Sequence, residues 1–349
     1  MTATAPGERP KILVIRRDNI GDLVCTTPLL GALRGRFPDA WLAVFANSYN
    51  APVLAGHPDL DAVYAYRKGK HVDAGLLALA GERIRFVLEL RRRRLDSVVL
   101  ATPAYQPRML RLARLLAPKH IVGFVGERAP RAIDRPVSLA GAEGEHEVDR
   151  VFRLARAFGV EGPPPPLRIA VDATEAARVR SALAARGFAG APIGIHLSAR
   201  KPSQRWPADR FVALMRALHE RRRAAFMLFW SPGLAGHPQH PGDDEKAREV
   251  IEATRSLPVL PWPTRELGSL IAGIAACRSM VMSDGGAMHV AAALGRPIVC
   301  FFGKSDAARW RPWGAPHTLL LPASLEVADI ALGDALAACD SLAESLRAG

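Results

Sequence analysis

Short apolar runs alternate with helical stretches along almost the whole chain, and this alternation limits the possible folds more than any other feature. Residues 11–17 (KILVIRR) form an apolar run without polar alternation, as in a strand that is buried on both faces of a parallel sheet. Helical spacing follows, and the pattern then repeats. We therefore expect a doubly wound α/β fold with parallel sheets. Further strands are expected at residues 41–46, 62–66, 97–101, 121–125, 192–197, 224–230, 279–282 and 297–302.

A proline run divides this pattern into two halves. Residues 163–166 are four consecutive prolines, which cannot continue a helix and favour a stiff, extended connector. A chain of 349 residues also suits two domains of ~150 to 180 residues. We expect one Rossmann-like domain over residues 1–162, a linker over residues 163–166, and a second Rossmann-like domain over residues 167–349, whose final helix could pack back onto the first domain.

The chain is basic, with 47 Lys and Arg against 34 Asp and Glu and a net charge of +13. This excess favours an anionic partner, such as nucleic acid, an acidic membrane surface or a phosphorylated glycolipid, although solvated arginine-rich faces explain it equally well. Aromatic residues make up 6% and do not interleave with the basic runs, so the stacking platform of a single-strand binder is missing. We therefore expect no nucleic-acid partner and keep a basic nucleic-acid-binding protein as the alternative from a different class.

Neither a membrane-spanning segment nor a signal peptide is expected. No stretch of about 18 uncharged apolar residues occurs, and the first residues lack an apolar core. We expect a cytoplasmic protein whose membrane association, if any, is peripheral and electrostatic, at the inner face of the inner membrane. The cysteines lie in apolar segments without the paired spacing of a zinc site, so they should be buried and inert. They are Cys25, Cys277, Cys300 and Cys339.

Two glycines mark the most specific candidate site. A strand is expected to end just before Asp284, and an alanine-rich helix begins at Gly285 and Gly286, with His289 one turn in. Glycine lets backbone N–H groups approach a ligand closely, and the positive end of the helix dipole points to the same place. The stretch predicts a phosphate site, with a plain turn between strand and helix as the alternative.

Two further polar stretches follow expected strands in the same half. The loop of residues 198–207 (SARKPSQRWP) carries Lys201 and Arg205, and Trp206 next to a proline indicates that packing anchors it. Its cations could grip a diphosphate together with the helix end, or they could simply be solvated. Asp243 opens an acidic cluster at the start of a helix, where it either favours the helix dipole or binds ribose hydroxyls.

The first half offers an acid and a set of arginines. Asp22 follows the first strand and precedes a helix, at the sheet edge where open α/β sheets bind ligands. A carboxylate that only caps the helix is an equal alternative. Arg128, Arg131 and Arg135 lie in a polar loop before His146 and are candidates for contact with an anionic acceptor.

Taken together, these residues resemble glycosyltransferase family 9, the ADP-heptose:lipopolysaccharide heptosyltransferases. The resemblance spans nearly the whole chain and implies the GT-B fold, in which two Rossmann-like domains face each other across a cleft, the first binding the acceptor and the second the nucleotide sugar. It rests on residues 11–38 (KILVIRRDNIGDLVCTTPLLGALRGRFP), 196–211 (HLSARKPSQRWPADRF) and 283–314 (SDGGAMHVAAALGRPIVCFFGKSDAARWRPWG).

The resemblance also implies a role for each matching residue. Asp22 matches the proposed general base, which takes a proton from the acceptor hydroxyl. The other matches are Asp284 and His289 for the donor sugar, Gly285, Gly286 and Ala287 for the diphosphate, and Asp243 for the adenosine ribose. The family often has lysine two residues before the tryptophan, but this chain has Gln204 there. Lys201, Arg205 or both must then supply the charge that binds phosphate.

The implied reaction is inverting sugar transfer by direct displacement, without a metal ion or cofactor. The chain agrees in lacking a spaced Asp-x-Asp at a strand end. The expected donor is ADP-heptose, and the expected acceptor is an anionic glycolipid of the lipopolysaccharide inner core. An enzyme of the same fold that uses another nucleotide sugar or a protein acceptor is the alternative.

Overall fold

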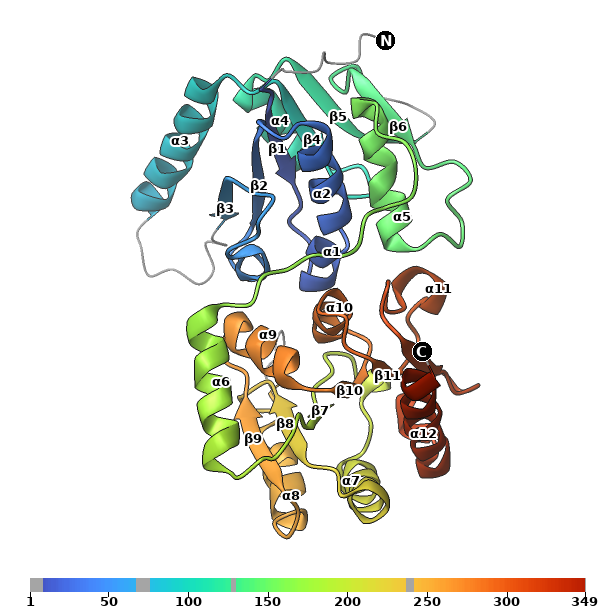
Figure 1. Cartoon of the computed structure of the whole chain (residues 1–349). Coiled ribbons are helices and arrows are strands. Elements are labelled where there is room, and N and C mark those ends of the chain that lie inside the picture. The colour runs from blue at the N-terminus through green and yellow to red at the C-terminus, as the bar shows by residue number, and fades with distance from the viewer. Residues whose placement is uncertain (1–8, 67–75, 127–129, 237–241, 349) are drawn as a thin grey trace. The chain divides into compact units, whose positions relative to one another are not determined.

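The computed structural model describes residues 9–66, 76–126, 130–236 and 242–348 (Figure 1). The chain forms two compact units, Met1–Ala170 and Val171–Gly349. The division falls a few residues after the proline run, just before α6 (Ala173–Ala185). Among the residues described, no helix is both long and apolar enough to cross a membrane.

The first unit is built on a six-stranded sheet in which all neighbouring strands are parallel. The strand order is β3-β2-β1-β4-β5-β6, so the chain builds outwards from β1 on one side and then returns to β4 on the other. Only the first residue of β1 (Lys11–Ile15) is exposed, as expected for a central strand of a doubly wound sheet. The other strands are β2 (Trp41–Asn47), β3 (Ala62–Tyr66), β4 (Ser97–Leu100), β5 (His120–Val125) and β6 (Arg135–Ser138). The helices are α1 (Ile20–Val24), α2 (Thr27–Arg36), η1 (Ala51–Leu54), α3 (Leu76–Arg93), α4 (Pro107–Leu116), α5 (Glu147–Phe152) and η3 (Arg153–Phe158).

The second unit repeats this plan with a second parallel six-stranded sheet. Its strand order is β12-β11-β10-β7-β8-β9, so β10 returns to the side of β7 that β8 leaves free. Its strands are β7 (Ile193–His196), β8 (Phe226–Trp230), β9 (Val259–Pro263), β10 (Ser279–Ser283), β11 (Ile298–Phe301) and β12 (His317–Leu320). After α6, its helices are η4 (Pro202–Gln204), α7 (Ala208–Arg222), α8 (Asp244–Ala253), α9 (Leu267–Ala276), α10 (Gly286–Ala293), α11 (Ala307–Trp310), η5 (Val327–Asp329) and α12 (Leu332–Ala348).

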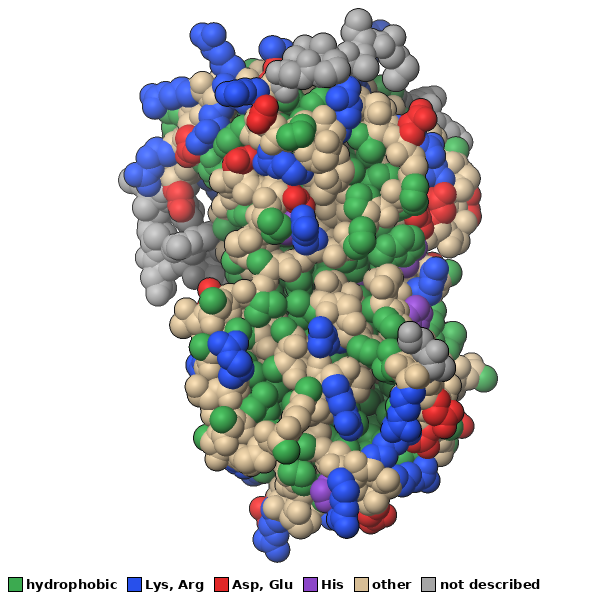
Figure 2. Space-filling view, viewed as in Figure 1, with side chains coloured by type: hydrophobic (Ala, Val, Ile, Leu, Met, Phe, Trp, Pro, Cys, Tyr) green, Lys and Arg blue, Asp and Glu red, His purple; other side chains and the backbone are tan. Residues whose placement is uncertain are grey.

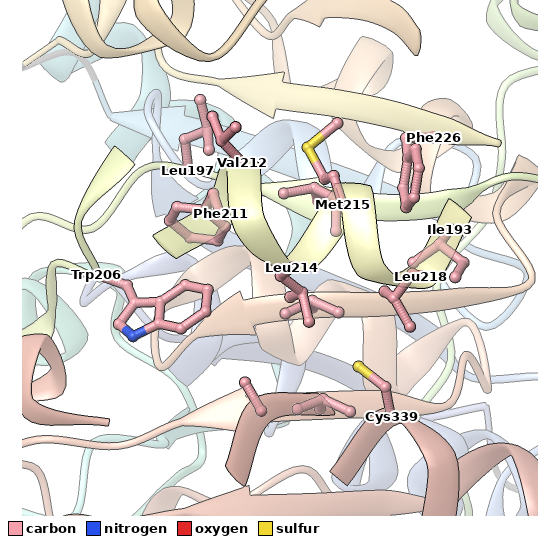
Figure 3. Close-up of a cluster of buried hydrophobic side chains, with 14 of the residues drawn as sticks. Ile193, Leu197, Trp206, Phe211, Val212, Leu214, Met215, Leu218, Phe226 and Cys339 are labelled. Carbon is pink, nitrogen blue, oxygen red and sulfur yellow. The ribbon is translucent and has the colours of Figure 1, made fainter. Parts of the chain in front are cut away.

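The core of the second unit anchors the loop between β7 and α7 (Figure 3). Trp206 is 1% exposed, and its ring centroid lies 4.9 Å from that of Phe211 and 4.8 Å from that of Phe301. Its indole N–H donates a hydrogen bond to Ile330 O at 3.0 Å. The predicted anchoring of this loop by Trp206 is therefore confirmed.

The final helix, α12, packs within the second unit, against α7, β11 and β12. Ala335, Cys339 and Leu342 recur at intervals of three or four residues and are buried in the second core. Such a stripe is the apolar face of an amphipathic helix. The sequence alone left open whether this helix contacts the first domain. In the structure its apolar face is buried against the sheet of the second unit.

Three strands were not expected from the sequence, and each lies at an edge of its sheet. They are β6, β9 and β12. The expectation that Arg135 lies in a polar loop is therefore wrong, because this residue begins β6. That strand pairs on one side only and alternates half-buried and exposed residues, so it lacks the apolar run of a central strand. The four cysteines are buried, as predicted.

Charged side chains are dispersed on the face shown in Figure 2. Lys and Arg side chains appear on both units, with acidic side chains among them. A nucleic-acid-binding surface would instead concentrate basic residues in a patch or stripe. This face therefore lacks the electrostatic footprint of a nucleic-acid-binding protein.

Candidate active site

A buried arginine organises the polar groups at the carboxyl edge of the first sheet. Arg16 directly follows β1 and is 1% exposed. Its Nη2 donates to Asp22 Oδ1 at 2.6 Å and to Glu147 Oε1 at 2.7 Å, and its Nη1 donates to Ala101 O. Its Nε forms an ion pair with Asp18 Oδ2 at 3.0 Å. Three carboxylates therefore surround a single guanidinium.

Asp22 is held from both sides. Its Oδ2 accepts hydrogen bonds from the backbone N and the side-chain Nδ2 of Asn19, both at 2.9 Å, which closes a capping box at the start of α1. Burial raises the pKa of Asp22, but the charge of Arg16 and the Asn19 hydrogen bonds outweigh this effect and leave the pKa below its usual value. Asp22 is therefore an anion at neutral pH. Its hydrogen bonds with Asn19 also give it the helix-capping role that the sequence offered as an alternative.

Asp18 joins this site to the loop after β4. Its carboxylate accepts hydrogen bonds from Thr102 Oγ1 at 2.9 Å and from Gln106 Nε2 at 3.3 Å. Since β4 lies on the opposite side of β1 from β2, this is the point at which the strand order reverses. Ligands of open α/β sheets bind at such points. The first unit therefore carries its polar cluster where this fold binds ligands.

The second unit has its own reversal point, between β7 and β10. The loop after β7 meets the turn after β10 there, and Gln204 Nε2 donates to Asp284 Oδ2 and to Ser305 Oγ, both at 2.8 Å. Burial raises the pKa of Asp284, and hydrogen bonds from Ser305 and Gln204 and the charge of Lys201 reduce this rise without cancelling it. Asp284 and Lys201, which the sequence predicted separately, are thus brought together.

The predicted phosphate site lies beside this cluster. Gly285 is exposed and caps α10, which begins at Gly286. The N–H groups of Gly286 and Ala287 belong to the first turn, where helix geometry offers no internal acceptor. They are half-buried and remain able to donate to an anion.

Gly303 explains how the loop after β7 comes so close to the end of β11. A Cβ at this position would lie 2.7 Å from Ser203 O and 2.9 Å from Leu325 O, closer than carbon and oxygen atoms pack. Only glycine fits without moving backbone. The glycine that ends the apolar run of β11 therefore helps to place Gln204 beside Asp284.

Arg205 and Asp243 pair with each other. Arg205 Nη1 donates to Asp243 Oδ1 at 3.1 Å, and its Nε donates to Ala199 O at 2.9 Å. Asp243 is 3% exposed, and its Oδ2, like Arg205 Nη2, is buried without a hydrogen-bond partner in the described part of the chain. Arg205 thus holds the loop in place, which leaves the exposed Lys201 as the freer of the two cations predicted to bind phosphate.

The remaining predicted residues lie in different surroundings. His289 is 3% exposed, and its ring lies 5.9 Å from that of Trp310 in an edge-on arrangement. Arg131 is exposed. Arg135 is level with Val14 in the sheet register but three strands from β1, about 14 Å at the usual strand spacing. Arg128 lies outside the described residues.

Sequence reasoning missed four residues of these two clusters. Glu147 contacts Arg16 across 131 positions of the chain, and Lys246 Nζ donates to Trp206 O at 2.6 Å. The only sequence signal for Arg16 was an arginine directly after a buried apolar run, and Glu147, Lys246 and Ser305 gave none. Within the described chain, no group of three or more His, Cys, Asp or Glu side chains could hold a metal ion.

Two parallel Rossmann-like sheets, each with polar groups at its reversal point, define the architecture of a GT-B glycosyltransferase. The chain belongs to glycosyltransferase family 9 (heptosyltransferase), whose family model matches residues 83–329. The resemblance drawn from the sequence is therefore confirmed, and the protein is a glycosyltransferase.

Curated relatives and solved structures agree with this membership. The chain is 25% identical over 305 residues to lipopolysaccharide heptosyltransferase 3 of Escherichia coli, covering 84% of this chain and 83% of the relative. It is 26% identical over 325 residues to lipopolysaccharide heptosyltransferase 2 of Salmonella typhimurium, covering 85% and 83%. A family 9 glycosyltransferase from Veillonella parvula has the same fold, with a TM-score of 0.79, 19% identity and coverage of 99% and 100%. So does ADP-heptose LPS heptosyltransferase II of E. coli, with a TM-score of 0.75, 23% identity and coverage of 97% and 99%.

Proposed function

We propose that this protein transfers a heptose from ADP-heptose to an anionic acceptor of the lipopolysaccharide inner core, with inversion at the anomeric carbon. The observation that carries the proposal is the start of α10, where Asp284 and the charge of Lys201 lie beside the N–H groups of Gly286 and Ala287. A nucleotide sugar needs both parts, because its diphosphate requires N–H donors and cations while its sugar hydroxyls require an acceptor.

On the donor side, the backbone of residues 285–287 and Lys201 hold the diphosphate. Asp284 accepts a hydrogen bond from a sugar hydroxyl, and His289 lies one turn further along α10 as a second sugar contact. Asp243 Oδ2, a buried oxygen without a partner in the described residues, is the atom proposed to meet the ribose. Arg205 supports the site through Asp243 and contributes charge at longer range.

On the acceptor side, Asp22 removes the proton of the attacking hydroxyl. The hydroxyl oxygen forms a bond to the anomeric carbon as the bond from that carbon to the diphosphate oxygen breaks, and the departing negative charge meets the helix end and Lys201. Because Arg16 holds the pKa of Asp22 below its usual value, Asp22 is a weak base. Proton transfer should therefore be late, once bond formation has made the hydroxyl acidic. Arg131, Arg135 and Arg128 remain proposed contacts of the acceptor's anionic groups.

The test is transfer to purified inner-core glycolipid with ADP-, GDP- and UDP-linked sugars as donors. We expect turnover with ADP-heptose alone, and a loss of roughly a hundredfold or more in Asp22→Asn, as for a typical general base. The thermal stabilisation by ADP should be unchanged in this variant, since the donor binds elsewhere. Asp39→Asn, at an exposed position of the same unit, serves as the control.

Three results would count against the proposal. Near-normal turnover of Asp22→Asn would remove Asp22 from its role. Turnover with UDP- or GDP-sugars instead of ADP-heptose would change the donor. Modification of a co-expressed protein but not of the glycolipid would change the acceptor class.

We also propose that the enzyme works in the cytoplasm and approaches the inner face of the inner membrane through its positive charge of +13. Charge-driven binding weakens as salt screens it. Co-sedimentation with anionic vesicles should therefore fall steeply between 50 mM and 500 mM salt. Binding that does not depend on salt would contradict an electrostatic attachment.

A further inference from the structure

A pocket lies at the edge of the second sheet that is opposite to the proposed donor site. It has a volume of about 270 Å³ and is lined by the first residues of β7 and β10, by β11 and by the last turns of α12. The proposed donor site lies beyond the other end of β10, about 17 Å away at the rise of a five-residue strand. Figure 3 shows Cys339, one of its lining residues, on α12 below Leu218. Neither the proposed donor nor the proposed acceptor occupies this pocket.

The pocket combines an apolar wall with a positive rim. Met280 and Leu342 are buried in the wall, and Leu346 is 45% exposed at its edge. Three arginines also line the pocket, namely Arg222, Arg278 and Arg347. This pairing of surfaces matches a ligand with one anionic end and one apolar end.

The positive charge of the rim is only partly compensated. In the described ranges, the one carboxylate that pairs with these arginines is Asp340, which binds Arg222 and is shared with Arg221. Among the described residues, the guanidinium groups of Arg278 and Arg347 have neither a hydrogen bond nor an ion pair. The pocket therefore carries an excess of positive charge.

Arg278 is an exposed residue beside the like charge of Arg222. Partial desolvation and this neighbouring charge both lower its pKa. Two cations that lie close together repel each other, and an anion bound between them would offset this repulsion. A guanidinium pair is well suited to hold a phosphate or carboxylate through several hydrogen bonds.

We propose that this pocket is a binding site for a small amphipathic anion, whose phosphate or carboxylate head is held by Arg278 and Arg222 and whose apolar body packs on Met280, Leu342 and Leu346. A cavity of roughly 150 Å³ takes one benzene molecule. The volume here is nearly twice that and suits a short alkyl chain with its head at the rim. The site is independent of the proposed transferase reaction.

The test is titration calorimetry of the full chain with hexyl phosphate in the presence of saturating ADP. We expect saturable binding that Arg278→Leu weakens about tenfold or more, as for the loss of a charged hydrogen-bonding partner. Arg255→Leu is the matched control, because Arg255 is exposed on the same unit and, in the part of the chain that the structure describes, its ion pair is with Glu252, a neighbour on the helix surface. Inorganic phosphate and hexanol should each bind more weakly than hexyl phosphate, because each lacks one half of the recognised chemistry.

A second variant blocks the pocket without changing its charge. Ala343 lines the pocket from α12, and Ala343→Trp should fill it and abolish hexyl phosphate binding with all three arginines intact. The melting temperature of unliganded Arg278→Leu should equal or exceed that of the parent, which separates a ligand-binding arginine from a structural one. A large loss of stability in this variant, unaltered binding in both variants, or displacement of hexyl phosphate by ADP would overturn the proposal.

Vesicles distinguish the two sources of such an anion. If the head group belongs to a lipid, Arg278→Leu should lose binding to phosphatidylglycerol vesicles relative to Arg255→Leu, and hexyl phosphate should compete with the vesicles. If the ligand is a free metabolite, vesicle binding should be equal in the two variants while hexyl phosphate binding still differs. The absence of saturable hexyl phosphate binding up to millimolar concentration would exclude both.

Discussion

Replacement of Arg16 by methionine is the sharpest test of the polar cluster in the first unit. Methionine keeps an unbranched side chain but is shorter and carries no charge, so Arg16→Met removes the cation that Asp18, Asp22 and Glu147 share. Glu147 is fully buried, and Asp22 is 8% exposed. Neither carboxylate can recover its lost partner by turning toward water.

The expected loss follows from this burial. Removing one partner of a buried ion pair costs about 3 to 5 kcal/mol in the free energy of unfolding, and two buried carboxylates lose their shared cation here, so the upper end of this range applies. In the parent protein, the lowered pKa of Asp22 stabilises the fold above its unfolded pKa of about 3.9, and this contribution is lost as the pH falls through the folded pKa. Without Arg16, the pKa of Asp22 should rise, because burial raises it and the charge that lowers it is gone. The deficit of the variant should therefore be largest near pH 8 and shrink toward pH 5, where Asp22 takes up a proton.

Urea unfolding at pH 8 and pH 5 measures this deficit. Because the two units need not unfold together, hydrogen exchange of peptides from the first unit should accompany it. Arg111→Met, at an exposed position on α4, is the control and should change the free energy of unfolding by less than about 0.5 kcal/mol. A deficit below about 1 kcal/mol for Arg16→Met, or an equal deficit at both pH values, would refute the reasoning.

Three further predictions concern the second unit. Gly303→Ala should lower the melting temperature and weaken ADP binding, because its Cβ would displace backbone that lies 2.7 and 2.9 Å away; unchanged ADP affinity in a thermal-shift titration would contradict this. Trp206→Ala should cost about 3 to 5 kcal/mol in urea unfolding, as for a large buried aromatic side chain, whereas a cost near zero would mean that the loop is anchored elsewhere. Gln204→Leu removes a hydrogen bond that lowers the pKa of Asp284, so the acid limb of the pH–rate profile should move to higher pH, and an unmoved limb would exclude a role for this contact.

Apart from β3, the strands that the sequence predicted are central strands of their sheets, whereas the strands that it missed are not. Every apolar run became a strand, because central strands of a parallel sheet are covered on both faces and must be apolar throughout. The missed strands β6, β9 and β12 all lie at sheet edges. In β9 (VLPWP) two prolines argue against a strand, yet an edge strand tolerates residues without a backbone N–H because one of its sides needs no partner.

The same distinction holds for the candidate site. The turn after β10, the anchoring Trp206 and the acid at Asp22 could be predicted because each is local, a strand end followed by a helix start or a packing residue. The contacts of Glu147 with Arg16 and of Gln204 with Asp284 join residues 131 and 80 positions apart. They depend on which strands become neighbours, and the order of strands in a sheet is not written in any local pattern.

The two clusters are suited to different tasks because they differ in charge compensation. In the first unit Arg16 is surrounded by an excess of carboxylates, so the cluster repels a diphosphate and can serve as a base. In the second unit a single carboxylate, Asp284, lies beside the helix end, Lys201 and the neutral amide of Gln204, so this cluster is less negative than the first and is better suited to an anion. Gln204 is central to this difference, because it fixes Asp284 through hydrogen bonds without adding charge. Phosphate binding would then rest on backbone N–H groups and Lys201. The variant Gln204→Lys should therefore gain affinity for ADP rather than lose it.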